Sequence, residues 1–218
     1  MIEVQNLSKR YKQGPTTVEA LANVSFGLEI GETLAIVGPS GSGKTTLLSL
    51  LAGLESATDG SVRIHGQNLF SLSERDLSLF RARNIGIVFQ QFHLMPHLTA
   101  VENVSLPLEI QGDPKSSEKG IEALRSVGLE HRKDHLPSEL SGGECQRVAI
   151  ARAIAVEPTV LLADEPSGNL DTDTGNKVMD LIFELVAKKK VTLILVTHDP
   201  ELAKRCGKHI SLLGGRIQ

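Results

Sequence analysis

One short segment constrains this chain of 218 residues more than any other: Gly38-Pro-Ser-Gly-Ser-Gly-Lys-Thr45, which follows the apolar run Thr33–Val37. It matches the pattern G-x-x-x-x-G-K-[ST] in full. Phosphate oxygens need several backbone N–H donors that converge from one loop, and glycines let the backbone curl that tightly. A Gly/Ser-rich turn that matched by chance would not need a buried-type strand before it and an apolar helix after it. The sequence therefore predicts a nucleotide-phosphate site.

Each part of this loop has an expected task. The helix that begins near Lys44 adds its positive N-terminal end. Lys44 supplies a charge for the β- and γ-phosphates, and Thr45 a hydroxyl for Mg²⁺. The expected ligands are ATP and Mg²⁺, and the expected nucleotide-binding residues of the segment are Gly38, Pro39, Ser40, Gly41, Ser42, Gly43, Lys44, Thr45 and Thr46.

A pair of acids follows a second apolar run, Val160–Ala163. Ligands of open α/β sheets bind at the carboxyl ends of the strands, so Asp164 and Glu165 are expected to meet the phosphates. Asp164 suits Mg²⁺, usually through water, and Glu165 is placed to polarise an attacking water. The alternative is that these acids only cap the next helix. A phosphate loop in the same chain favours the catalytic interpretation.

The apolar runs predict an α/β fold with a mostly parallel sheet and an inserted helical lobe. With the phosphate loop, this fold resembles a P-loop NTPase (RecA-like) core, a resemblance that implies an N-terminal antiparallel β part. Continuous apolar runs at Thr33–Val37, Ile85–Phe89, Val160–Ala163 and Val191–Val196 are typical of strands buried on both faces. We expect residues 1–91 and 157–218 to form the α/β core and residues 92–156 the lobe. Helices are expected at Thr45–Leu51 and Asn176–Ala187, and a surface loop at Gln111–Lys119.

Composition excludes several other classes of protein. A formal charge of −3 and a pI near 6.2 give no basic surface for nucleic acid. The apolar runs fall short of the roughly 18–20 residues that span a bilayer, and the N-terminus has no apolar signal core. The two cysteines, Cys145 and Cys206, lack metal-binding spacing and are expected to be reduced cytosolic thiols. We therefore expect a soluble cytoplasmic chain whose membrane role, if any, comes through a partner.

A second glycine motif, Leu140-Ser-Gly-Gly-Glu144, precedes the apolar stretch Cys145–Ala155. Ser141 and Glu144 form an S-x-x-E capping box, which accounts for those two residues structurally. It does not account for Gly142 and Gly143, since each glycine in a first helical turn costs about 1 kcal/mol relative to alanine. Close approach of the backbone to an anion at an exposed helix N-terminus would explain them.

With these motifs in this order, the sequence resembles the ATP-binding cassette family over essentially its full length. Leu140–Glu144 resembles the family signature, which Gln146-Arg147 follows. Tyr11 lies where the family stacks an aromatic ring on adenine, and Gln90 matches the glutamine that senses Mg²⁺ at the start of the helical lobe. His198 matches the histidine that contacts the γ-phosphate. Taken singly, these three residues are explained as well by surface packing, a loop and a strand-end cap.

The resemblance implies how such a chain works. Two cassettes pair head to tail, and the signature of one, Ser141 to Glu144, closes over ATP held by the other. Asp171 resembles the acidic residue at the dimer seam that links the two sites. The implied partners are a second copy of the chain and integral membrane permease subunits. The expected location is therefore peripheral, on the cytoplasmic face of the plasma membrane.

The subfamily is indicated by Phe92–Val104, by Asp164-Glu-Pro-Ser-Gly-Asn-Leu-Asp171 and by the early end at Gln218. These resemble the lipoprotein-release, macrolide-efflux and antimicrobial-peptide-resistance ATPases, which transmit force to permeases with large extracytoplasmic domains. Cys145 stands where the family usually has glutamine. At a helix N-terminus its thiol pKa would be lowered, which would make the site sensitive to oxidation.

Other members of the family are alternatives. Within transporters, an amino-acid importer or a cell-division ATPase remains open. Soluble ABC ATPases of DNA repair insert a coiled coil before the signature, whereas no sustained heptad separates Lys44 from Ser141 here. Those of translation carry two cassettes, and this chain has one. A non-hydrolysing regulatory module would lack Lys44 or Glu165, and both are present.

Overall fold

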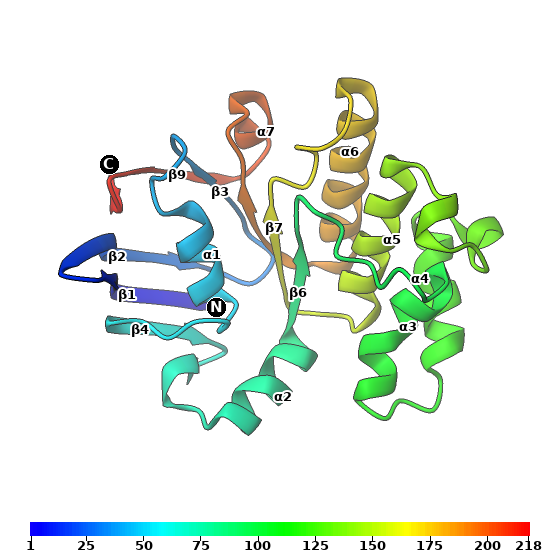
Figure 1. Cartoon of the computed structure of the whole chain (residues 1–218), viewed down its shortest axis with the longest axis horizontal. Helices are drawn as coiled ribbons and strands as arrows, with labels where there is room; N and C mark the ends of the chain where they lie inside the picture. The colour runs from blue at the N-terminus through cyan, green and yellow to red at the C-terminus, as the bar shows by residue number, and fades with distance from the viewer. The chain divides into compact units, whose positions relative to one another are not determined.

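The computed structural model describes residues 1–218, the side chain of Gln13 apart, and the chain divides into two compact units (Figure 1). The first unit comprises Met1–Arg81 and Thr192–Gln218, and the second comprises Ala82–Val191. Each unit contains part of the predicted α/β core, so each is described by itself.

The first unit contains most of the strands. They are β1 (Ile2–Gln13), β2 (Thr16–Leu28), β3 (Thr33–Val37), β4 (Asp59–Ile64), β5 (Gln67–Asn68), β8 (Thr192–Val196), β9 (Lys208–Leu213) and β10 (Arg216–Ile217). Its helices are α1 (Lys44–Leu51), the 3₁₀ turn η1 (Leu69–Ser71), α7 (Pro200–Lys204) and α2 (Glu74–Asn84), whose last turn extends into the second unit.

The predicted N-terminal antiparallel part is a sheet of order β2-β1-β4-β5. β1 pairs antiparallel with both β2 and β4, which lie beside it in Figure 1. Alternation of side chains along β1 buries Ile2 and Val4 while Glu3 stays partly exposed, as expected for a sheet with one covered face.

The second sheet of this unit is built on β3. Both β8 and β9 pair with β3 in parallel, and β10 returns antiparallel to β9. All five residues of β8 are buried, which agrees with the continuous apolar run in the sequence. Parallel pairing brings the carboxyl ends of these strands to one edge, and β3 leads directly from that edge into the glycine-rich loop and α1.

The second unit combines two parallel strands with helices. The strands are β6 (Ile85–Val88) and β7 (Val160–Asp164). The helices are α3 (Ala100–Ile110), α4 (Ser116–Ser126), α5 (Gly142–Ala155) and α6 (Thr172–Lys189), with 3₁₀ turns η2 (Glu130–Arg132) and η3 (Pro137–Glu139). Helices α3, α4 and α5 pack on one another, and α5 also packs on β6 (Figure 1).

Local sequence explains where these helices begin. Thr99 and Glu102 form a capping box on α3, and Ser141 and Glu144 form another on α5. Asp171 caps α6 by accepting a hydrogen bond from the Thr174 backbone N–H at 3.0 Å. The structure corrects one expectation: the polar stretch Gln111–Lys119 is a loop only in part, because α4 begins at Ser116.

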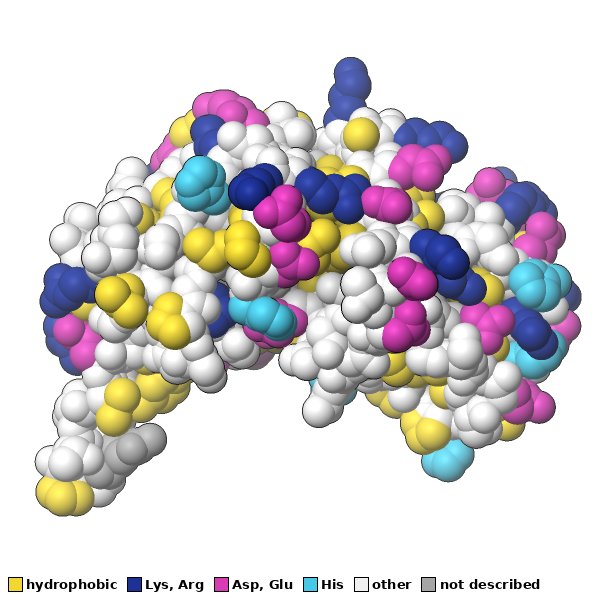
Figure 2. All heavy atoms as spheres, turned by 90° about the horizontal axis from the view of Figure 1, so that it is seen from above, with side chains coloured by type: hydrophobic (Ala, Val, Ile, Leu, Met, Phe, Trp, Pro, Cys, Tyr) yellow, Lys and Arg dark blue, Asp and Glu magenta, His cyan; other side chains and the backbone are white. Residues whose placement is uncertain are grey.

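The predicted fold class is confirmed, with parallel strands and helices in both units and an antiparallel sheet at the N-terminus. The boundaries of the helical lobe at residues 92 and 156 stay a prediction. Among the described residues, no helix is both long enough and apolar enough to cross a bilayer. On the face drawn in Figure 2, basic and acidic side chains are interspersed rather than gathered by sign.

Candidate nucleotide site

The glycine-rich loop of the first unit has little space for side chains. A Cβ on Gly38 would come within 2.2 Å of the Leu212 carbonyl oxygen, and one on Gly43 within 2.5 Å of the Ala20 carbonyl oxygen. Gly41 has open space around it, but its φ of 77° lies in the left-handed region. The three glycines are therefore required, two by close backbone contacts and one by conformation.

Lys44 lies across this loop. It is only 8% exposed, and its Nζ donates hydrogen bonds to the carbonyl oxygens of Gly38 and Pro39, each at 2.9 Å. The ammonium group is thus held inside the curl of the backbone, where a phosphate group would face it. Ser42 Oγ is buried and has no hydrogen-bond partner among the described residues.

The N-terminus of α1 differs from those of the other capped helices. Its N-cap is Gly43, with no side-chain hydrogen bond and no acid in the first turn, whereas α3, α5 and α6 are capped by Thr99, Ser141 and Asp171. The first N–H groups of a helix require acceptors, and the N-cap residue Gly43 has no side chain to supply one. An anionic phosphate fits this position because the helix dipole favours negative charge there.

Tyr11 lies next to the same helix. A hydrogen bond from Thr46 reaches its hydroxyl, which in turn donates to Glu55 Oε2 at 2.7 Å. Burial first, and then the hydrogen bond to Glu55, raise the pKa of Tyr11. Lys9 Nζ is 4.9 Å from the ring centroid and 3.1 Å from Glu55 Oε2, so one face of the ring is covered by a cation. Stacking on adenine would therefore use the other face.

His198 follows β8 at the edge of the sheet that carries the phosphate loop. Ile36 of β3 is aligned with Val196 of β8, and Thr197 N–H donates to the Ile36 carbonyl oxygen at 3.2 Å. His198 is therefore level with Gly38, since each lies two residues beyond an aligned pair. The first unit thus brings together Tyr11, the loop and His198.

The second unit brings together the remaining predicted residues of the site. Val88 of β6 is aligned with Ala163 of β7, so Gln90 and Glu165 each lie two residues beyond that pair. Glu165 has a φ of 43°, a left-handed conformation that is uncommon outside glycine and is concentrated at functional sites. The cap of the following helix is Asp171, so Asp164 and Glu165 are not its N-cap.

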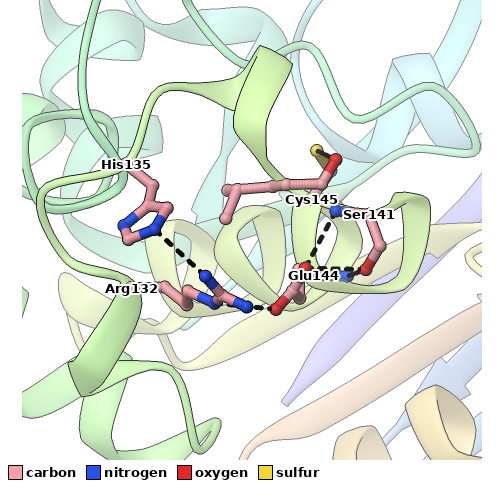
Figure 3. A network of polar contacts seen from close by, with 6 residues as sticks. Arg132, His135, Ser141, Glu144 and Cys145 are labelled. Carbon is pink, nitrogen blue, oxygen red and sulfur yellow. Dashed lines mark hydrogen bonds and ion pairs between the residues drawn. The ribbon is translucent and has the colours of Figure 1, made fainter.

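The signature motif forms the N-terminus of α5 (Figure 3). Ser141 donates to Glu144 Oε2 from both its backbone N–H, at 2.9 Å, and its hydroxyl, at 2.8 Å. Arg132 Nε lies 3.2 Å from Glu144 Oε1, and Arg132 also contacts His135 Nε2 at 3.0 Å. The backbone and hydroxyl of Ser141 lower the pKa of Glu144 more than Arg132 does, so its carboxylate stays ionised and holds the first turn.

The two signature glycines have different surroundings. A Cβ on Gly143 would come within 2.5 Å of Thr174 Cγ2, whereas one on Gly142 would have ordinary contacts with Leu170 and Phe92 at 3.5 and 3.8 Å. Gly143 is therefore explained by packing within the chain. Gly142 is not, and close approach of a ligand remains its best explanation.

The expectation of a lowered pKa at Cys145 is wrong. Its Sγ is buried and faces the carbonyl oxygens of Pro137 and Leu140 at 3.5 and 3.9 Å. Burial, and then the charge of Glu144, raise the pKa of the thiol. The thiolate is disfavoured, which removes the reason to expect sensitivity to oxidation.

Two features of the site were missed by the sequence analysis. Asn169 exchanges two hydrogen bonds with Gln90, and Glu55 accepts the hydroxyl of Tyr11. Asn169 lies between Glu165 and Asp171, a stretch already singled out, so its amide was a detectable signal. Glu55 follows α1 without a motif, and only the fold brings it to Tyr11.

The oxygen donors that were predicted for Mg²⁺ suit that ion. Thr45 offers a hydroxyl, Gln90 an amide oxygen and Asp164 a carboxylate, and Mg²⁺ prefers such ligands together with phosphate and water. Thr45 belongs to the first unit, and Gln90 and Asp164 to the second. In the first unit Thr45 and the uncapped α1 suit a phosphate with its metal, and in the second unit Gln90 and Asp164 suit the metal.

Comparison with known proteins agrees with this geometry. Residues 21–168 match the sequence pattern of the family described as ABC transporter. The chain is 47% identical to the uncharacterised ABC transporter ATP-binding protein YbbA of Escherichia coli, covering 100% of this chain and 96% of YbbA. It is 46% identical to the lipoprotein-releasing system ATP-binding protein LolD of Geobacter metallireducens, covering 100% and 97%.

A solved structure is similar as well. The ATP-binding cassette MJ0796, in a dimeric post-hydrolysis state bound to ADP and Pi, superimposes with a TM-score of 0.92 at 40% identity. The match covers 100% of this chain and 97% of that one.

Proposed function

The chain belongs to the ABC transporter family of ATP-binding proteins, and from this premise we propose that it works as one half of a dimeric, Mg²⁺-dependent ATPase that drives membrane permease subunits. Its similarity to family members extends over the full length of the chain, and ATP hydrolysis is the activity of that family.

The observation that carries the proposal is the α1 N-terminus. Its N–H groups lack a side-chain cap, its loop contains three required glycines, and the buried Lys44 ammonium lies across the loop. Together these groups bind and orient the phosphates of ATP, with Lys44 balancing charge on the β- and γ-phosphates. Tyr11 contributes its uncovered ring face to the adenine.

Activation of the attacking water is assigned to Glu165. Thr45, Asp164 and Gln90 would hold Mg²⁺, directly or through water, and the ion would neutralise charge on the phosphates. Glu165 accepts a hydrogen bond from the attacking water and polarises it as a general base. The left-handed backbone at Glu165 sets the direction of the carboxylate. His198 contacts the γ-phosphate from the edge of β8.

The signature requires a second copy of the chain. Ser141, Gly142 and Gly143 present a helix N-terminus that is fixed by Glu144, and α1 of the same chain already offers one phosphate site. In a head-to-tail dimer, each signature closes over the ATP of the other copy, so the N-termini of both α1 and α5 contact phosphate. Asp171 lies at the seam of this dimer. The dimeric state of the similar cassette MJ0796 supports this arrangement.

The proposed setting is the cytoplasmic face of the plasma membrane, with residues 92–156 as the helical lobe that meets permease subunits. The 46% identity to a LolD protein supports a lipoprotein-release or macrolide-efflux type of complex, in which the ATPase transmits force rather than opening a solute path. An amino-acid importer or a cell-division complex is the second candidate, because the substrate is recognised by the permease.

Replacement of the water-polarising residue tests the hydrolytic role. Glu165→Gln keeps the shape of the side chain but not its basicity, so turnover is expected to fall at least 100-fold while ATP binding persists. With ATP and Mg²⁺ the variant should elute as a dimer in size-exclusion chromatography, and the parent as a monomer. A variant that hydrolyses ATP at the parental rate removes Glu165 from this role.

Purification of the complex from membranes tests the setting. The tagged chain is solubilised in mild detergent and its partner identified by mass spectrometry. A permease with a large extracytoplasmic domain is the expected result. A compact multi-helix permease would favour the importer instead.

A further inference from the structure

The predicted Mg²⁺-sensing residue Gln90 is held by a partner that family resemblance did not assign. Its Nε2 donates to Asn169 Oδ1 at 3.1 Å, and Asn169 Nδ2 donates back to the Gln90 carbonyl oxygen at 3.0 Å. Both side chains are exposed and both belong to the second unit. The pair is reciprocal, since each residue is a donor to the other.

The chemistry of these two bonds fixes the orientation of both amides. A backbone carbonyl only accepts, so the Asn169 group that faces the Gln90 carbonyl must be its NH₂. Oδ1 of Asn169 therefore faces the side chain of Gln90, and the Gln90 NH₂ group must donate the hydrogen bond to it. The oxygen of Gln90, Oε1, is then the atom turned away from Asn169. An amide oxygen binds a cation and an amide NH₂ does not, so this orientation decides whether Gln90 can act as a metal ligand.

The backbone around Gln90 is anchored separately, by α5. Gln146 Nε2 donates to the Phe89 carbonyl oxygen at 3.3 Å, and Arg152 donates to the carbonyl oxygens of Phe92 and His93 at 3.0 and 2.7 Å. The chain is thus held before and after Gln90. What remains to be set is the rotation of its side-chain amide, which is the part that Asn169 contacts.

Gly168 supports the same conclusion independently. A Cβ there would come within 2.9 Å of Gln90 Nε2, and the backbone of Gly168 is not in the left-handed region. The conformation permits any residue, so the nearest obstacle to a side chain at this position is Gln90, whose amide would have to shift if residue 168 carried a Cβ. Two consecutive residues, Gly168 and Asn169, form the seat of that amide.

The segment that carries this seat also touches the signature. Leu170 lies against Gly142, and Thr174 against Gly143. Residues 168–174 therefore contact the Gln90 amide at one end and the signature glycines at the other.

We propose that Asn169 is a positioning residue that, together with Gly168, turns the amide oxygen of Gln90 toward the metal of the bound nucleotide. Residues 168–174 link that orientation to the signature helix. This rests on the proposed function, because it assumes that the chain hydrolyses ATP with Mg²⁺. The ligand class is a divalent cation, and Asn169 acts on it only through Gln90.

The test compares Asn169→Ala and Gly168→Ala with the parent. The first removes the partner of the amide, and the second occupies its space. Each should raise the Mg²⁺ concentration for half-maximal ATPase activity about tenfold, at the lower end of the range for residues that orient a metal ligand. The KM for ATP at saturating Mg²⁺ should stay within about twofold of the parent, which distinguishes loss of orientation from general damage.

A second readout does not depend on turnover. In the Glu165→Gln background with ATP bound, the dissociation constant of Mn²⁺ is measured by electron paramagnetic resonance of the free ion. Asn169→Ala should raise it by a similar factor. The matched control is Asn176→Ala, which removes an exposed asparagine from α6 and should leave the Mn²⁺ affinity unchanged.

A double-mutant cycle with Gln90→Ala assigns the effect. If Asn169 acts through Gln90, Asn169→Ala adds nothing once Gln90 is gone. Additive effects on metal affinity, or parental Mg²⁺ dependence in both single variants, overturn the inference. A parent protein without Mg²⁺-dependent hydrolysis would instead overturn the proposed function, so the two failures are told apart.

Discussion

At the scale of single residues, Glu144 shows how one carboxylate fixes a binding motif. Its Oε2 accepts hydrogen bonds from the Ser141 backbone N–H and hydroxyl, and its Oε1 faces Arg132. With the Ser141 hydroxyl donating to Glu144, the first turn of α5 is set before any ligand arrives. The anionic form of Glu144 is therefore the one that organises the signature.

A pH prediction follows for Glu144. The hydrogen bonds from Ser141 lower the pKa of Glu144 in the folded chain. The charged carboxylate therefore stabilises the folded state at pH values above the pKa that Glu144 has in the unfolded chain. This contribution is lost as the pH falls through the pKa of the folded chain. Glu144→Gln keeps the capping contacts without the charge. The parent should exceed the variant in free energy of unfolding at pH 7, and the gap should narrow below about pH 4.5 in urea titrations. A gap that is constant with pH contradicts the assignment.

Single residues also show what a sequence can and cannot predict. The apolar strands before Lys44 and Thr45 and at Asp164 and Glu165 were predictable, and the structure has β3 and β7 there, while the roles of these four residues stay predictions. The pKa of Cys145 was not, because burial outweighs the helix N-terminus and only packing shows burial.

At the scale of elements, α5 and α6 are fitted to each other at Gly143 and Thr174. In the sequence, Gly142 and Gly143 are notable because glycine lowers the stability of a helix, and a bound ligand is the expected reason for both. The structure gives Gly143 a different reason, since a methyl group there would overlap Thr174 Cγ2. A contact between residues on two helices leaves no pattern in either one.

This contact predicts a rescue. Gly143→Ala should destabilise the chain by about 1–3 kcal/mol, the usual cost of overpacking. Thr174→Ser removes the opposing methyl group and should restore at least half of that loss in the double variant. Gly142→Ala is the control, and it should cost less than 1 kcal/mol because its Cβ would make ordinary contacts. Equal losses in urea unfolding for both glycine variants would contradict the packing argument.

Element boundaries were less predictable than element types. The buried parallel strands β3, β7 and β8 were located within one residue by their apolar runs, whereas β2 and β4 of the antiparallel sheet were not predicted. Helix α6 begins at Thr172, ahead of the expected Asn176, because the Asp171 cap starts it in a polar stretch without apolar periodicity. Helix α4 begins at Ser116, inside the stretch expected to be a loop, because its first turn is polar and shows no apolar periodicity.

At the scale of the whole molecule, the chain separates into two compact units. One contains the phosphate loop, and the other contains the acid pair and the signature. The sequence order of the motifs predicted their family but not this division, since contacts among distant residues define it. The proposed pairing with a second copy has to be tested in solution on the whole chain.

The concentration dependence of unfolding tests that assembly. If ATP holds two copies of Glu165→Gln together, folding is linked to dimerisation and the melting temperature rises with protein concentration. A tenfold higher concentration should raise it by about 2 °C for a chain of this size. With ADP, the melting temperature should be independent of concentration. A concentration-independent value with ATP and Mg²⁺ would contradict the dimer.

The cap on α6 has a consequence for genetics. Asp171 begins α6 through its bond to Thr174 and is also the residue proposed for the dimer seam. Such a residue is pleiotropic: one codon change produces two phenotypes, loss of a helix cap worth about 1 kcal/mol and loss of communication between sites. Asp171→Asn, which can still cap the helix, is the allele that separates them, whereas a null phenotype from Asp171→Ala identifies neither.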